Sequence, residues 1–212
     1  EVQKRAVESA GGIMLGFHWS NLPFIVNPEH LTPQHVFFLW GKNAHEWLFL
    51  KGNSVRHALP CGIWMVPSGR MPEKVCEFSN NIKFVIGIFD SSCRYNDPQS
   101  PETLSQFYLC VLELLEENVN WAGIVKPKNF INIDDLLALP QGKQIAFKMR
   151  SLVEQKRLVL LNNMMSPIKA ATCSSLSLCY GLNSAGIIAG ICGFRAIHWD
   201  CGWLGYPIWK DQ

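Results

Sequence analysis

The sequence predicts an α/β chain with a doubly wound parallel sheet and an additional αβ segment at the N-terminal end. From residue 82 onward, apolar runs of strand length alternate with stretches of helix length, an order typical of parallel sheets. The clearest strand candidate, residues 81–89, is mostly apolar, as strands covered on both faces are. No charged residue lies between Lys169 and Arg195, and this stretch divides into a strand, a turn, a helix and a strand.

The first part of the chain has the signals of a small αβ unit. We expect a helix at residues 1–10, strands at 13–17 and 35–40, a helix at 44–51, and the close of the unit at 59–62. Residues 22–33 carry three prolines and read as a connection. Residues 66–72 have the composition of a linker. We therefore predict that residues 1–66 are the end of an N-terminal domain or an interdomain αβ segment, and that residues 67–212 form a second, Rossmann-like domain.

The second part supplies the larger sheet. Its strands are expected at residues 81–89, 121–125, 158–161, 175–180 and 196–199, and its helices at 102–117, 133–137, 144–155, 166–171 and 185–192. The helix at 102–117 is amphipathic. Its predicted core stripe contains Leu104, Phe107, Tyr108, Val111, Leu114 and Leu115. Crossovers between these parallel strands should be right-handed.

Composition limits the class of protein. The 212 residues are 48% hydrophobic and 17% charged, which is enough for a sizeable core. A formal net charge of +2 gives no reason to expect a nucleic-acid surface. Serines and glycines interrupt the apolar stretch at 172–200, so we do not expect a transmembrane helix. The chain begins Glu-Val-Gln-Lys, without an initiator Met or a signal sequence, and we interpret it as an excised domain.

The eight cysteines favour a reducing compartment. None belongs to a C-x-x-C pair, so neither a zinc site nor any other metal is expected. Most lie in apolar surroundings, as buried thiols do. A cytoplasmic location is the simpler interpretation, although the even count leaves disulfides open.

Polar groups follow three of the predicted strands at their carboxyl ends, where parallel sheets bind ligands. Asp90, Ser91 and Ser92 follow the first strand, and Lys126 and Lys128 follow the second. Asn183 and Ser184 are the expected caps at the N-terminus of the helix at 185–192. Hydroxyls, cations and helix N-terminal amides together could form a cleft for a diphosphate. The alternative is a purely structural βαβ unit with solvated lysines.

Other sites are weaker or excluded. The chain lacks the G-x-x-x-x-G-K-[ST], G-x-G-x-x-G, G-x-S-x-G and H-E-x-x-H patterns, which argues against the corresponding nucleotide, hydrolase and zinc sites. His18 follows a predicted strand and is a candidate acid–base group. His198 and Asp200 close the last strand, where they either contact a ligand or cap a structural turn.

A resemblance covers most of the chain. The succession GFHWSN, HVFFLWGKNA, LPCG, FVIGIFDSS, GIVKPK and GLNSAGIIAGICGFRAIHWD resembles surface-carbohydrate or polysaccharide biosynthesis proteins. These are similar to GT-B glycosyltransferases and, more distantly, to CDP-glycerol glycerophosphotransferases. The resemblance implies two Rossmann-like domains facing a cleft, with the C-terminal one holding a nucleotide-activated sugar donor.

The resemblance also implies roles for matched positions. Asp90, Ser91 and Ser92 lie where a loop approaches the donor, Lys126 faces its phosphates, and Gly181, Asn183, Ser184 and Gly186 begin the phosphate-binding loop and helix. His18 is the candidate base for the acceptor hydroxyl. The expected partners are the donor and a carbohydrate or lipid-linked acceptor, with room for peripheral membrane association and with no cofactor beyond the activated sugar.

Two alternatives remain beside a glycosyltransferase. No acidic residue lies near the helix at 185–192, where a Glu often holds the ribose in that family, and this favours a non-catalytic binding module of the same fold. A transferase that moves glycerol phosphate from a CDP-activated donor is the other. Fold-level likeness does not decide among these functions.

Overall fold

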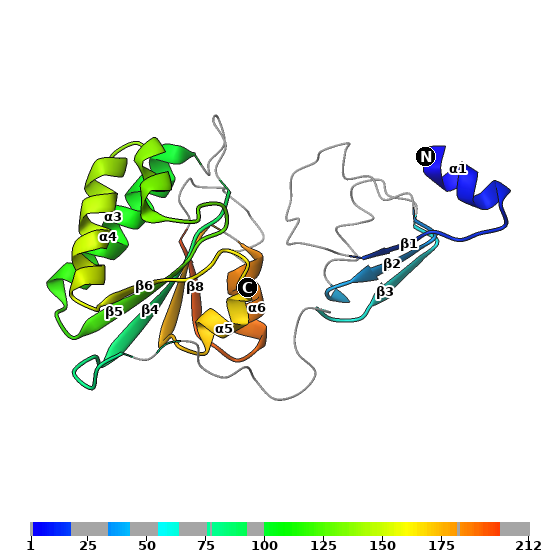
Figure 1. The fold of residues 1–212 in the computed structure, drawn as a ribbon. Coiled ribbons are helices and arrows are strands. Elements are labelled where there is room, and N and C mark those ends of the chain that lie inside the picture. The colour runs from blue at the N-terminus through cyan, green and yellow to red at the C-terminus, as the bar shows by residue number, and fades with distance from the viewer. Residues whose placement is uncertain are drawn as a thin grey trace. The chain divides into compact units, whose positions relative to one another are not determined.

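The protein is described from a computed structural model, which defines residues 2–17, 34–42, 55–63, 76, 78–92, 100–181 and 183–199. The chain divides into two compact units, Glu1–Ser68 and Gly69–Gln212. Each unit holds one sheet, and every strand pair in the described ranges is parallel. The predicted α/β class with parallel sheets is therefore confirmed (Figure 1).

The first unit has a three-stranded sheet in the order β1-β2-β3. Its elements are α1 Val2–Ser9, β1 Leu15–Phe17, β2 Val36–Leu39 and β3 His57–Pro60. His35 ties the helix to the sheet, because its Nδ1 accepts from Met14 N at 2.9 Å and its Nε2 lies 2.8 Å from Glu8 Oε1. The helix predicted at residues 44–51 lies outside the described residues.

Strand β3 corrects the prediction for residues 59–62, which were expected only to close the unit. The strand has four residues, ends at Pro60 and, among the described strands, pairs with β2 alone. Proline is tolerated at such an edge because its missing N–H is not needed by a second neighbour. A run of four residues that ends in a proline carries little strand signal in the sequence.

The second unit has a five-stranded sheet in the order β6-β5-β4-β7-β8 (Figure 1). The strands are β4 Phe84–Phe89, β5 Trp121–Lys126, β6 Leu158–Leu160, β7 Leu176–Tyr180 and β8 Ala196–Trp199. The chain runs outward from β4 through β5 to β6, then returns to the other side of β4 for β7 and β8. This order is compatible with a Rossmann-like fold.

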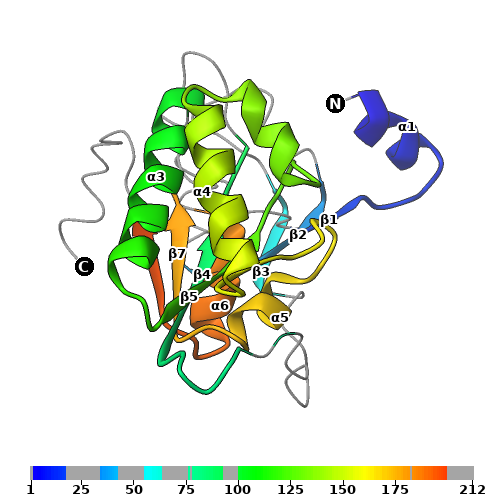
Figure 2. The same cartoon turned by 60° about the vertical axis from the view of Figure 1, so that its left-hand side comes forward.

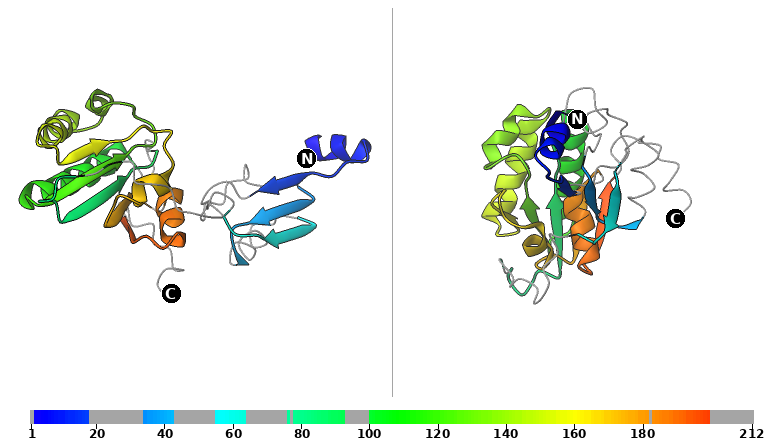
Figure 3. Two further views of the ribbon diagram at one scale, coloured as in Figure 1. Left: turned by 60° about the horizontal axis from the view of Figure 1, so that its bottom comes forward. Right: turned by 90° about the vertical axis from the view of Figure 1, so that its right-hand side faces the viewer.

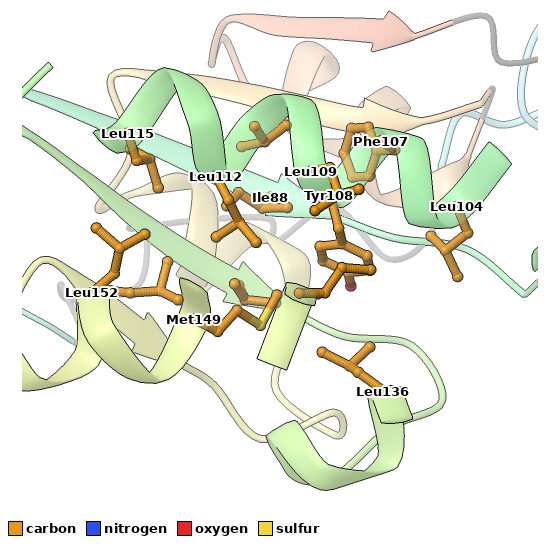
Figure 4. Close-up of a cluster of buried hydrophobic side chains, with 14 of the residues drawn as sticks. Ile88, Leu104, Phe107, Tyr108, Leu109, Leu112, Leu115, Leu136, Met149 and Leu152 are labelled. Atoms are coloured by element: carbon orange, nitrogen blue, oxygen red, sulfur yellow. The ribbon is translucent and has the colours of Figure 1, made fainter. Parts of the chain in front are cut away.

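Helices cover both faces of that sheet (Figure 3). They are α3 Pro101–Glu117, the 3₁₀ helix η2 Ile133–Ala138, α4 Gly142–Glu154, α5 Pro167–Ala171 and α6 Ser184–Ile191. Figure 2 shows α3 and α4 side by side over one face. On that face Ile88, Leu112 and Met149 belong to one buried cluster (Figure 4). On the other face Phe89 and Ile124 pack with Ala170 and Ala189 from α5 and α6.

The core stripe of α3 is shifted from the prediction: Leu114 lies outside it, and Leu109 and Leu112 lie within it. Leu114 was expected in the core but is 39% exposed, whereas Leu112 is fully buried. The two residues flank the stripe on opposite sides, because successive helical residues are turned by about 100°. The helix is rotated so that the Leu112 side meets α4 and the sheet, and periodicity alone cannot choose between two apolar flanks.

No helix in the described ranges combines the length and the apolar character that a membrane span requires. The longest helix there is α3, with 17 residues, and it carries charged residues on its outer side. The apolar stretch at 172–200 is divided among β7, α6 and β8.

Candidate functional site

The candidate site lies at the carboxyl edge of the larger sheet, where the strand order reverses at β4. Strand β4 pairs with β5 on one side and with β7 on the other. Asp90 follows β4, Lys126 ends β5, and Gly181 follows β7. The polar groups that the sequence places after these strands therefore come to one edge, at the position where open α/β sheets bind ligands.

Asp90 is buried at this edge, with 7% of its surface exposed. Lys128 N donates to its Oδ1, and the Tyr108 hydroxyl on α3 donates to its Oδ2 at 3.0 Å. Burial raises the pKa of Asp90 to about 6, although both hydrogen bonds and the charges of Lys126 and Lys128 act in the opposite direction. Both carboxylate oxygens thus face protein groups, and the side chain joins α3 to the loop after β5.

Lys126 and Lys128 bring positive charge to the same edge but differ in exposure. Lys126 is half-buried, and its Nζ donates to Asn163 O at 2.9 Å and to Pro127 O at 3.1 Å. Burial lowers the pKa of Lys126, and the charge of Asp90 raises it. Lys128 has an exposed side chain, while its backbone is fixed by Asp90. Lys126 therefore anchors two loops, and Lys128 presents its ammonium to solvent.

Asn183 connects the two strands at the reversal point. Its Oδ1 accepts from Gly186 N at 2.9 Å, which makes it the N-cap of α6. Its Nδ2 donates to Phe89 O at the end of β4 and to Tyr180 O at the end of β7, both at 3.3 Å. The predicted cap at Asn183 is confirmed, and Ser184 is the first helical residue. The N-terminus of α6 is thereby fixed against the end of β4.

The turn before α6 is held by β8. Gly181 has a positive φ of 61°, its N donates to Trp199 O at 2.9 Å, and its carbonyl lies 3.0 Å from His198 Nδ1. A carbonyl oxygen only accepts, so His198 carries a proton on Nδ1. Burial lowers the pKa of His198, which favours its neutral form. His198 therefore orients the turn.

Gly186 is packed too closely for any side chain. A Cβ there would lie 2.5 Å from Cys179 Sγ and 2.5 Å from His198 Cε1. Cys179 is fully buried, and burial raises the pKa of its thiol to about 12, so it is a neutral thiol at physiological pH. This cluster packs α6 onto β7 and β8.

The remaining predicted residues contribute less or lie elsewhere. Ser91 and Ser92 are half-buried after β4, and Ser92 Oγ accepts from Asn129 Nδ2 at 3.1 Å. His18 and Asp200 lie outside the described residues, so nothing is placed for either. Among the described residues, no three His, Cys, Asp or Glu side chains gather in a way that could hold a metal ion.

The sequence patterns do not predict two residues that contact the candidate site, Tyr108 and Asn129. Tyr108 belongs to the apolar stripe of α3 and reads as core, but its hydroxyl contacts Asp90. The signal for such a residue is a buried tyrosine, since its hydroxyl needs a polar partner. Asn129 gives no comparable signal, because an asparagine in a loop is ordinary.

Neither the protein-family models nor the curated proteins give a match to this chain. The function is therefore argued from the geometry of the carboxyl edge. This edge carries the N-terminus of α6, two lysines and serine hydroxyls. Groups of these kinds bind anions in α/β proteins.

Proposed function

We propose that this chain binds the diphosphate of a nucleotide-activated sugar at the carboxyl edge of the larger sheet. The observation that carries the proposal is the Asn183 bridge, which fixes the N-terminus of α6 beside the end of β4 where the strand order reverses. Helix N-termini favour anions through the helix dipole. Lys126 and Lys128 add positive charge beside Asp90, at the end of the neighbouring strand β5.

The reaction we propose is glycosyl transfer for surface polysaccharide, with the unit acting as the Rossmann-like donor domain of a GT-B arrangement. An acceptor hydroxyl attacks the anomeric carbon, the bond from that carbon to the diphosphate oxygen breaks, and its electron pair leaves with the diphosphate. The acceptor proton passes to a base, for which His18 stays the candidate. Lys126 and the α6 amides would stabilise the charge on the leaving group.

The partners follow from that chemistry. The acceptor is a carbohydrate or a lipid-linked carbohydrate. A lipid-linked acceptor would be reached by peripheral association with a membrane. The reaction needs no cofactor beyond the activated sugar. Cys110, Cys179 and Cys192 are free thiols, which supports a reducing compartment such as the cytoplasm. A CDP-activated glycerol donor would fit the same anion site, and product analysis separates the two transfers.

A non-catalytic binding module is the second candidate, and one observation favours it. The carboxylate of Asp90 and the Nδ1 of His198 are both engaged inside the fold. Neither group is therefore placed to take a proton from an acceptor, although both support a rigid ligand site. Donor binding without turnover would select this candidate.

The test is a thermal-shift screen against UDP, CDP, GDP, CMP and their sugar conjugates. A ligand that binds only the folded state raises the melting temperature by mass action. We expect a shift with one base, reduced in Lys126→Met and retained in Lys143→Met, which removes an exposed charge on α4. No shift with any conjugate in folded protein, or an equal shift in both variants, would contradict the proposed site.

A further inference from the structure

Asp90 is a buried acid at the carboxyl edge, and protein donors bond both of its carboxylate oxygens. Asp90 lies between α3, the end of β4 and the loop after β5, and each of its oxygens accepts a hydrogen bond from a different segment. The charged or titratable groups that face it are Tyr108 from α3, Lys126 from β5 and Lys128 from the following loop. On the β7 side, Asn183 donates to Phe89 O, the carbonyl just before Asp90, and its amide does not titrate.

Asp90 acts on the backbone position of Lys128 and on the charge of Lys126, and it does not itself bind an anion. A carboxylate repels a phosphate, and both of its oxygens already have protein donors. Its bond to Lys128 N fixes the backbone of the residue whose ammonium is exposed. Its charge also compensates that of Lys126, whose Nζ is held by Asn163 O and Pro127 O.

We propose that Asp90 is a positioning residue for the anion site: it fixes the loop that carries Lys128, and its uptake of a proton leaves more positive charge at the edge for an anionic ligand. The inference rests on the proposed function, because it assumes that an anion binds there. The ionised form holds the loop and neutralises part of the lysine charge. The protonated form leaves that charge uncompensated.

The pH range follows from burial. Desolvation raises the pKa of Asp90 to about 6, so the carboxyl takes up its proton between neutral and mildly acid pH. Anion affinity should therefore rise as the pH falls through this range. A unit charge about 8 Å from a dianion, in a dielectric close to that of water, changes affinity about fivefold.

The first measurement uses sulfate, which keeps its two charges between pH 5.5 and 7.5. Binding of radioactive sulfate to the full chain is followed by equilibrium dialysis at constant ionic strength. We expect the affinity of the wild type to rise about fivefold from pH 7.5 to 5.5. In Asp90→Asn, which keeps an oxygen acceptor for Lys128 N, it should be high at pH 7.5 and change less with pH. Asp134→Asn removes an exposed acid and should keep the wild-type profile.

The second measurement needs no ligand. The melting temperature of the wild type, relative to that of Asp90→Asn, should rise as the pH falls from 7.5 to 5.5, which reports proton uptake by Asp90 and shows that the variant folds. Equal pH dependence of sulfate binding in both proteins overturns the role of Asp90. If the melting temperature depends on Asp90 but sulfate does not bind at any pH, the proposed anion site does not exist. The proposed role of Asp90 in ligand binding is then overturned as well.

Discussion

At the scale of single residues, Asp90 should make the fold less stable at neutral pH. Its pKa is about 6 in the folded chain against an ordinary value of 3.8, so the folded state binds its proton more tightly than the unfolded state. Stability from this group is therefore present below pH 4 and is lost as the pH rises to about 6. The difference corresponds to about 3 kcal/mol.

Chemical denaturation at pH 4.5, 6 and 7.5 checks this expectation. The free energy of unfolding of the wild type, measured relative to Asp90→Asn, should fall across the series because the variant has no proton to release. A constant difference between the two proteins would mean that Asp90 does not titrate in this range. Retention of a buried acid that lowers stability is typical of functional sites.

Ser177 provides a second prediction at this scale. Its side chain on β7 is fully buried, and its Oγ has no hydrogen-bond partner among the described residues. Such a hydroxyl loses its hydration without compensation. Ser177→Ala should therefore leave the free energy of unfolding unchanged or raise it by about 1 kcal/mol. Ser105→Ala is the matched comparison, because the buried Ser105 Oγ donates to Pro101 O at 2.8 Å, and it should lower stability.

The sequence predicts which residues stand at the carboxyl edge but not where their side chains point. Strand order along the chain is enough to place Asp90, Lys126 and Asn183 after parallel strands. The inward direction of Asp90 depends on Tyr108, which lies 18 positions further along the chain. A contact between a strand end and a helix side chain is set by packing of α3 against the sheet, which a local pattern does not contain.

At the scale of elements, Asn183 should matter more than an ordinary helix cap. Its amide satisfies Gly186 N and also the carbonyls of Phe89 and Tyr180. Asn183→Ala would leave these buried groups without their partner, so the free energy of unfolding should fall by about 2–3 kcal/mol. Ser166→Ala at the start of α5 removes one capping bond, from Ile168 N, and should cost about 1 kcal/mol. Equal losses in urea titrations would contradict the bridging role.

Arg157 holds the end of α3 and was not predicted. Its Nη2 donates to Leu115 O and Asn118 O, and its Nε donates to Trp121 O at 3.1 Å. Cations at a helix C-terminus also interact favourably with the helix dipole. Arg157→Met should lower the free energy of unfolding by about 2 kcal/mol. Lys143→Met, on the exposed side of α4, should change it by less than about 0.5 kcal/mol.

Elements with strong periodicity or capping signals were predictable, and those that depend on partners were not. Residues 166–171 show a capping Ser before a first-turn Pro, and α5 forms there with both features. Strand β3 exists because β2 offers it a parallel partner, and nothing within its four residues requires it. Arg157 follows a helix and precedes a strand, so its sequence neighbours give no hint of a contact with α3.

At the scale of the whole molecule, the buried clusters belong to separate units. The two clusters of the larger sheet draw only on residues from Cys76 onward. The cluster of the first unit contains Phe37, Leu39 and Val55, with Ala58 packed against it. The larger unit therefore has a core on each face of its sheet, and the described residues of the smaller unit form a separate cluster of their own.

The last prediction follows from this division. Residues 69–212 expressed alone should fold and unfold in one cooperative transition near that of the full chain, because both faces of their sheet are covered from within the unit. Residues 1–68 alone should be at most marginally stable, because a chain of about 60–70 residues buries only about 60% of the surface that it exposes when unfolded. Circular dichroism and calorimetry of both fragments check this. A non-cooperative larger fragment would show that its stability depends on the first unit. If the larger fragment also gives the nucleotide shift of the full chain, the anion site is complete without residues 1–68.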